Sequence, residues 1–292
     1  MRRSMLFLPG NTPNVIQNGD VLGADAVIFD LEDAVAPAEK TAARILVRNT
    51  MRYLDFGTCG RIVRINSIDT PYWQKDLDLI MPYKPDLILL PKTSSAWEAQ
   101  EADRYMTALE EKLGFEPNTV GLMPLIETAM GVENAFAIAT ATKRVKALFL
   151  GAEDLTADLQ CKRTKEGREI EYARTRLVVA ARAAGVDVYD TPFTDVNDDE
   201  GIVVDAQYAK ALGFTGKSSI SPRHVEVINR VFSPTPKEIE YAYEVLEAIE
   251  EAKAQGKGAI ALYGKMIDAP IVTRAQRTIA AAEALGIRRD ML

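Results

Sequence analysis

Two acidic residues follow neighbouring apolar, β-branched runs of the chain. Glu127 comes directly after the run 120–126, and Asp154 lies just beyond the run 145–150. If both runs are strands of one parallel barrel, the two carboxylates reach neighbouring positions on its rim. Magnesium in proteins is commonly held by one or two carboxylates, water and the substrate, so this pair predicts a magnesium site. The alternative is that either acid caps the helix that follows it.

An arginine occupies an apolar run at an earlier point of the chain. Arg64 lies between Val63 and Ile65, where a permanent charge is costly unless it faces carboxylates or a ligand. Its planar guanidinium suits a two-pronged grip on a carboxylate or an enolate oxygen. A structural ion pair with Asp30 or Glu32 is the alternative.

The remaining reactive side chains narrow the chemistry. Lys92 directly follows Pro91, and it is either a Schiff-base lysine or, as we favour, an ion-pair or anion contact. His224 is the single histidine, which excludes multi-histidine zinc sites. Cys59 and Cys161 are the only cysteines, and they provide neither a disulfide framework nor a thiolate metal site. The chemistry must therefore use carboxylates, Arg, Lys and a hard metal ion.

The elements that position these residues alternate between short apolar runs and longer stretches of helical periodicity. That alternation is typical of a parallel α/β fold, and eight such units favour a closed TIM (β/α)8 barrel over an open, doubly wound sheet. Helices are predicted between the strands, one of them over 132–141. The predicted strands are residues 5–8, 26–30, 61–65, 87–90, 120–126, 145–150, 186–189 and 216–220.

The chain continues past the eighth unit. Ser233-Pro234-Thr235-Pro236 breaks the pattern and starts a charged helix that reaches about residue 255. A last helix follows the segment 263–270 and ends near residue 285. We therefore predict a catalytic barrel over residues 1–232 and a C-terminal helical extension over 233–292. Pattern alone does not decide whether the extension packs on its own barrel or on a neighbouring subunit.

Composition excludes several classes of partner. The chain has 292 residues, 35 Lys and Arg against 42 Asp and Glu, and a formal net charge of −7, which disfavours nucleic acid and anionic membranes. Pro9-Gly10 cuts the apolar start short of a signal-peptide core, and no apolar run approaches the roughly 18 residues of a membrane span. We expect a cytoplasmic protein without a membrane or nucleic-acid partner.

Seven blocks of sequence, in this order, carry a resemblance that covers nearly the whole chain. The chain resembles the HpcH/HpaI aldolase/citrate lyase superfamily and, within it, the β subunits of citrate lyase, which are citryl-CoA lyases. The blocks are RSMLFLPGN (3–11), FDLEDAV (29–35), VRIN (63–66), LPK (90–92), IET (126–128), LGAEDL (150–155) and GKMIDAP (264–270).

The resemblance implies roles for individual residues. Glu127 and Asp154 match the family's magnesium ligands, and Arg64 matches the arginine that binds the oxo-acid half of the substrate. Asp268 matches an aspartate that a neighbouring subunit contributes as a catalytic acid/base. Glu32 and Asp33 match an acidic pair near the metal that positions water and Arg64. Apart from the resemblance, Asn11 and Lys92 are expected substrate contacts because they follow the first and fourth predicted strands.

One segment departs from the family's pattern. Many relatives have a histidine before the proline of Ser219-Ile220-Ser221-Pro222, and this chain has none there. A ligand contact by that histidine is therefore in doubt in this chain. His224 lies too far along the chain to be its replacement.

The resemblance also implies a reaction. The expected activity is magnesium-dependent cleavage of a citryl thioester to oxaloacetate and an acetyl thioester, with Mn²⁺ as an alternative metal. The thioester is carried either by coenzyme A or by an acyl carrier protein, and the citrate lyase α and γ subunits are expected partners. A shared site through Asp268 implies a homo-oligomer, a trimer or a multiple of one. The competing functions are a malyl-CoA or citramalyl-CoA lyase, a related thioesterase, and a non-catalytic binding subunit.

Overall fold

Eight parallel strands close into a barrel in the computed structural model, which describes residues 2–254 and 260–291. Neighbouring strands pair in chain order, and β1 closes the ring by pairing with β8 through Ser4 with Lys217 and Met5 with Ser218. The predicted TIM-type barrel is confirmed. The strands are β1 (Ser4–Pro9), β2 (Ala26–Asp30), β3 (Gly60–Arg64), β4 (Leu87–Leu90), β5 (Gly121–Ile126), β6 (Ala147–Leu150), β7 (Asp187–Asp190) and β8 (Gly216–Ser219).

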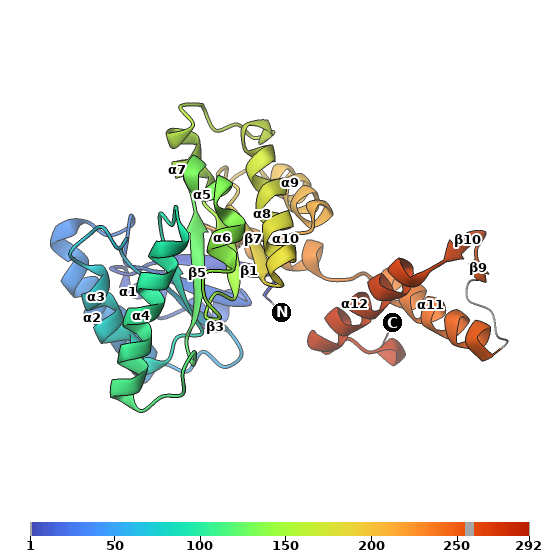
Figure 1. The fold of residues 1–292 in the computed structure, drawn as a ribbon, viewed down its shortest axis with the longest axis horizontal. Helices are drawn as coiled ribbons and strands as arrows, with labels where there is room; N and C mark the ends of the chain where they lie inside the picture. The colour runs from blue at the N-terminus through green and yellow to red at the C-terminus, as the bar shows by residue number, and fades with distance from the viewer. Residues whose placement is uncertain (1, 255–259, 292) are drawn as a thin grey trace. The chain divides into compact units, whose positions relative to one another are not determined.

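Helices connect the strands and cover the outside of the barrel (Figure 1). The α-helices are α1 (Pro13–Ile16), α2 (Lys40–Tyr53), α3 (Trp73–Ile80), α4 (Ala96–Leu113), α5 (Ala129–Glu133), α6 (Ala135–Ala139), α7 (Ala152–Asp158), α8 (Glu171–Ala184), α9 (Asp199–Leu212) and α10 (Pro222–Phe232). Short 3₁₀ turns are η1 (Gly19–Leu22), η2 (Pro37–Glu39), η3 (Met81–Tyr83) and η4 (Arg168–Ile170).

Local signals explain where individual helices begin and end. Ser95 and Glu98 form a capping box at the start of α4, and Gly114 ends that helix in a left-handed conformation with φ of 69°. The helix predicted over 132–141 is wrong in its extent: the chain forms two short helices, α5 and α6, which meet at Asn134. The backbone of Asn134, at φ −86° and ψ 5°, lies outside the helical region and interrupts the helix.

The strands are buried on both faces, as expected for a parallel barrel. Inward-facing side chains such as Ile28, Leu89 and Phe149 fill the interior. Outward-facing ones such as Val27 and Phe29 pack against the helices. The interior is therefore a packed core, which leaves only the carboxyl ends of the strands for a site.

The chain divides into two compact units, residues 2–230 and residues 231–292. The second unit contains α11 (Pro236–Ala254), β9 (Ile260–Leu262), β10 (Lys265–Ile267), α12 (Ala269–Ala284) and the 3₁₀ turn η5 (Arg289–Met291). It has its own core, in which Val245 and Ile249 belong to one cluster with Ile267 and Ile279. The antiparallel pairing of β9 with β10 was not predicted. Packing of this unit on a neighbouring subunit stays a prediction.

Within the described residues, no helix combines the length and the apolar character needed to cross a membrane.

Candidate active site

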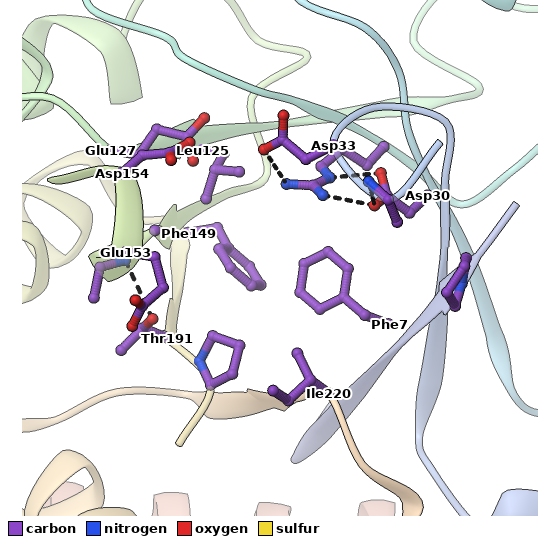
Figure 2. A pocket seen from close by; sticks show the side chains of 16 residues that line it. Phe7, Asp30, Asp33, Leu125, Glu127, Phe149, Glu153, Asp154, Thr191 and Ile220 are labelled. Atoms are coloured by element: carbon purple, nitrogen blue, oxygen red, sulfur yellow. Dashed lines mark hydrogen bonds and ion pairs between the residues drawn. The ribbon is translucent and has the colours of Figure 1, made fainter. Parts of the chain in front are cut away.

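A cavity of about 300 Å³ opens at the carboxyl ends of the strands. Figure 2 shows Glu127 and Asp154 together on one side of it, across from Asp33. Glu127 follows β5, and Asp154 lies in the first turn of α7, directly after β6. The barrel thus brings together the two acids that the sequence placed at neighbouring strand ends. Apolar side chains line much of the remaining wall: Phe7, Leu125, Phe149, Pro192 and Ile220.

Glu127 is a buried carboxylate in negative surroundings. It is 3% exposed, and its Oε1 accepts the backbone N–H of Lys92 at 2.6 Å. Burial, and then the charges of Glu32 and Asp154, raise the pKa of Glu127 to about 8. A bound cation would reverse this effect, because it favours the ionised form of every carboxylate around it.

Neither Glu127 nor Asp154 is the N-cap of the helix that follows it. Helix α5 is capped by the hydroxyl of Thr128, which accepts the N–H of Gly131 at 3.0 Å. Helix α7 has Gly151 at its N-cap, and Asp154 lies three positions later with its side chain lining the cavity. Both carboxylates therefore remain available to a ligand.

The acidic pair fits a magnesium ion better than a transition metal. Over residues 2–254 and 260–291, no group of three or more His, Cys, Asp or Glu side chains is arranged to hold a metal. Magnesium needs no such group, because water and substrate oxygens complete its shell. Glu127 and Asp154 would hold it, and the buried carboxylate of Glu32, whose Oε2 lies 3.1 Å from Arg64 Nη1, belongs to the same charged cluster.

Arg64 at the end of β3 is held by carboxylates of the β2 end. Its Nε and Nη2 donate to the two oxygens of Asp30 at 2.7 and 2.6 Å. Its Nη1 lies 3.1 Å from Glu32 Oε2. Burial alone would raise the pKa of Asp30, but hydrogen bonds and charge from Arg64 outweigh it and lower the pKa. The ion pair with Asp30 exists, and it fixes a guanidinium that also lines the cavity.

Lys92 lies in the same charged cluster. Its Nζ donates to Glu32 Oε1 at 2.8 Å and lies 3.5 Å from Asp33 Oδ1. Burial would lower the pKa of Lys92, but the hydrogen bond and charge of Glu32 raise it above the usual value. A Schiff-base lysine needs a neutral amine near pH 7. This geometry therefore favours the ion-pair interpretation of Lys92.

Two expected site residues make other contacts. Asn11 donates to Glu39 at 2.5 Å, and it is absent from the described lining of the cavity, so the structure does not place it there. Asp268 belongs to the C-terminal unit, where its carboxylate caps α12 by accepting the N–H of Ile271 at 3.2 Å. The roles of both residues stay predictions.

Several residues of the site were not found by sequence reasoning. Gly151 is one, because a Cβ there would lie 2.6 Å from Glu127 Oε2. Phe7 is another; its ring lies 5.2 Å from the guanidinium carbon of Arg64. The inward alternation of Met5 and Phe7 along β1 could have identified it. A second hollow, of about 630 Å³, also has Glu127 among its lining residues.

Comparison with known proteins identifies the family of the chain. The sequence model of the family described as HpcH/HpaI aldolase/citrate lyase matches residues 3–222. Citrate lyase subunit beta of Leuconostoc mesenteroides subsp. cremoris is 44% identical over 97% of this chain and 94% of its own. The corresponding subunit of Escherichia coli strain K12 is 38% identical over 99% of this chain and 96% of its own.

A solved structure shares both units of the chain. Protein CitE from Mycobacterium tuberculosis, in complex with magnesium, acetoacetate and coenzyme A, aligns with a TM-score of 0.80 and 31% identity. The alignment covers 97% of this chain and 98% of that one. On the family match and these identities, the chain belongs to the HpcH/HpaI aldolase/citrate lyase family.

Proposed function

We propose that this chain is a magnesium-dependent lyase that cleaves a citryl thioester to oxaloacetate and an acetyl thioester. The observation that carries the proposal is the pair of buried Glu127 and half-buried Asp154, which shares one cavity with the guanidinium of Arg64 that Asp30 holds in place. The substrate class is supported by relatives named citrate lyase subunit beta at 38–44% identity over nearly the whole chain.

The reaction needs a proton acceptor, a stabilised ketone and a proton donor. A base takes the proton of the tertiary hydroxyl, the adjacent carbon–carbon bond breaks, and its electrons leave as a thioester enolate. Magnesium, when bound, supplies Lewis-acid polarisation of the hydroxyl and carboxylate oxygens. Arg64 binds the oxo-acid half with the donors that Asp30 does not use.

The enolate carbon must then receive a proton. We assign this step to Asp268 of a neighbouring subunit, the residue that matches the family's catalytic acid/base. A general acid contributes about 10²–10⁴-fold to the rate of such a reaction. This assignment requires a homo-oligomer, and we propose a trimer or a multiple of one. We further propose that the thioester is carried by coenzyme A or by an acyl carrier subunit, with a citrate lyase α subunit as a partner.

A panel of thioesters tests the substrate. The purified protein with Mg²⁺ should release oxaloacetate from citryl-CoA faster than it releases pyruvate from citramalyl-CoA or glyoxylate from malyl-CoA. A relative named citramalyl-CoA lyase, from Homo sapiens, is 34% identical over 97% of this chain, and one named (3S)-malyl-CoA thioesterase, from Cereibacter sphaeroides, is 36% identical over 98%, so both activities are competitors. Preferential release of pyruvate would reassign the substrate and leave the metal site in place.

Substitution of the metal ligands tests the site. Glu127→Gln and Asp154→Asn should each lower kcat/KM at least about 100-fold, because metal polarisation supplies several kcal/mol of the barrier reduction. Both variants should fold, since they keep the shape of the side chain. Glu133→Gln at the end of α5, whose carboxylate accepts from exposed Tyr172, is the matched control and should keep wild-type activity. Full activity in both ligand variants would remove the metal assignment.

A further inference from the structure

A buried lysine at the start of α2 is not explained by the site described so far. Lys40 is 8% exposed, and its Nζ donates to two main-chain carbonyls, that of Leu31 at 2.8 Å and that of Glu32 at 2.6 Å. These carbonyls belong to the segment after β2, which carries Glu32 and Asp33. We call residues 31–39 the β2–α2 segment.

Other contacts hold the β2–α2 segment from the barrel side. Asp30 accepts the backbone N–H of Glu32 at 2.9 Å and that of Ala34 at 3.2 Å. The carbonyl of Glu32 also accepts the N–H of Val35 at 3.0 Å. Asp30 therefore holds two backbone N–H groups of the segment. Lys40 holds the carbonyl groups of the two peptide bonds that flank the Cα of Glu32.

The main chain at Glu32 determines where its carboxylate lies. Glu32 Oε1 accepts from Lys92 at 2.8 Å, and Oε2 lies 3.1 Å from Arg64 Nη1. Both distances depend on the backbone dihedrals of Glu32, because the side chain is 7% exposed and has no room to adjust. A rotation of the flanking peptide groups would withdraw the carboxylate from both cations.

Burying a lysine so that it binds two loop carbonyls carries a desolvation penalty. Burial lowers the pKa of Lys40, although the charges of Asp30, Glu32 and Asp76 oppose that effect. An apolar side chain of similar length would fill the same space without the desolvation penalty. The lysine adds two charge-assisted hydrogen bonds and a positive charge beneath an acidic cluster.

We propose that Lys40 is a positioning residue that holds the Glu32 carboxylate between Arg64 and Lys92. Lys40 donates its hydrogen bonds to the main chain of Leu31 and Glu32, and neither of these residues is a candidate metal ligand or belongs to the described lining of the cavity. The inference rests on the proposed function for its kinetic consequences.

The decisive variant is Lys40→Met, which keeps the length of the side chain and removes the donors and the charge. We expect kcat to fall about 10–100-fold, the range for partners that orient a site residue, with KM changed less than about threefold. The acid limb of the kcat/KM profile should move to higher pH, because Glu32 loses a nearby positive charge. Lys40→Arg keeps the hydrogen-bond donors and the charge. It should restore at least part of kcat and bring the acid limb of the kcat/KM profile back toward its wild-type pH.

The matched control lies at the opposite end of the barrel. Arg3→Met removes a cation that donates to Asp25 at 2.7 and 2.8 Å before β1 and β2. It should lower stability while leaving kcat and the acid limb unchanged. If Lys40→Met does not fold, Lys40→Gln replaces it and should be less active than Lys40→Arg. Equal activity of the Lys40→Gln and Lys40→Arg variants would overturn the inference.

Hydrogen exchange separates this inference from the proposed function. The amides of Glu32, Ala34 and Val35 should exchange faster in Lys40→Met than in the wild type, with β2 unchanged, whatever the substrate is. A wild-type protein inactive on all the thioesters would defeat the proposed function but leave this readout intact. An unchanged exchange rate in the segment, or wild-type kcat with an unmoved acid limb, would refute the role of Lys40.

Discussion

The charged residues of the site do not balance, and the imbalance explains the need for a cation. At the strand ends, two cationic side chains face five carboxylates, so their formal sum is −3 when every group is ionised. The carboxylates of Asp30, Glu32 and Glu127 are buried, so water screens their charges only weakly. An anionic substrate would be repelled unless a metal ion offsets the carboxylates. The residues are Arg64 and Lys92 against Asp30, Glu32, Asp33, Glu127 and Asp154.

Arg64→Lys tests whether the planar fork of the guanidinium matters apart from its charge. A lysine ammonium cannot donate to both oxygens of Asp30 and to a substrate carboxylate in one plane. We expect kcat/KM for the citryl thioester to fall at least about 100-fold, with Mg²⁺ affinity changed little. Steady-state kinetics and calorimetric titration with Mg²⁺ measure the two effects.

Arg61→Lys is the control for that substitution. Arg61 lies on the same strand, is half-buried, and donates to the carbonyl of Lys84 at 3.1 Å. It should retain full activity. If Arg64→Lys is also fully active, the two-pronged grip on the substrate is wrong and Arg64 serves only its ion pair with Asp30.

The turn between β6 and α7 positions Asp154 and also leaves space for the carboxylate of Glu127. A Cβ on Gly151 would lie 2.6 Å from Glu127 Oε2 and 2.8 Å from its Cβ. The backbone of Gly151, with φ of −104°, suits any residue, so the requirement is one of space. The glycine therefore belongs to the proposed metal site although it would contribute no ligand atom.

Gly151→Ala should weaken Mg²⁺ binding at least about tenfold, because the methyl group displaces the Glu127 carboxylate. Calorimetric titration with Mg²⁺ measures the change. Gly60→Ala, where the nearest atoms would lie 3.1–3.2 Å from the new Cβ at the start of β3, should bind Mg²⁺ like the wild type. Unchanged affinity in Gly151→Ala would show that Glu127 adjusts without loss of the ligand geometry.

Helix α10 carries a buried histidine that should make stability depend on pH. His224 is 1% exposed, and neither ring nitrogen has a hydrogen-bond partner among the described residues. Burial lowers the pKa of His224 below its usual 6.5; the charge of Asp199 opposes this effect, and the charge of Arg223 adds to it. The unfolded chain therefore takes up a proton at a pH where the folded protein does not.

The stabilising effect of the neutral His224 should be complete above pH 6.5 and lost as the pH falls through the lower folded pKa. The free energy of unfolding, measured in urea with Mg²⁺ saturating, should decrease more steeply between about pH 7 and 5 in the wild type than in His224→Phe. Parallel pH profiles for the two proteins would mean that His224 titrates normally.

The order of elements was predictable from sequence because each strand and helix buries its own apolar pattern. Glu127, Asp154 and Arg64 could be predicted for a related reason: a parallel barrel places strand ends on one rim. Lys40 and Gly151 could not, since their roles depend on which atoms lie nearby in space. Asn11 was predicted from its position after β1, but a nearby acceptor, Glu39, binds its amide.

The division of the chain into two units separates the candidate catalytic groups. Arg64, Glu127 and Asp154 belong to residues 2–230, whereas Asp268 belongs to residues 231–292. Asp268 is exposed and lies between β10 and α12. A cyclic oligomer would let each barrel receive the acid of its neighbour, because head-to-tail contacts close into rings. The proposed mechanism is then a property of the assembly.

Mixing two inactive variants tests this arrangement. Glu127→Gln damages the barrel but keeps Asp268, and Asp268→Asn does the reverse while preserving an N-cap for α12. In a ring of freely exchanged subunits, about one site in four combines an intact barrel with an intact neighbouring acid. Co-expressed variants should therefore recover roughly a quarter of wild-type activity, measured as oxaloacetate release, from parents that each have almost none.

The matched control pairs Glu127→Gln with Asp154→Asn, which both damage the barrel. No combination of these subunits assembles an intact metal site, so co-expression should recover nothing, and the comparison removes any contribution from altered folding or expression. If the Glu127→Gln and Asp268→Asn subunits mix without regaining activity, Asp268 acts within its own chain. If Asp268→Asn alone is fully active, the acid that protonates the enolate must come from the barrel, and the C-terminal unit has no catalytic part.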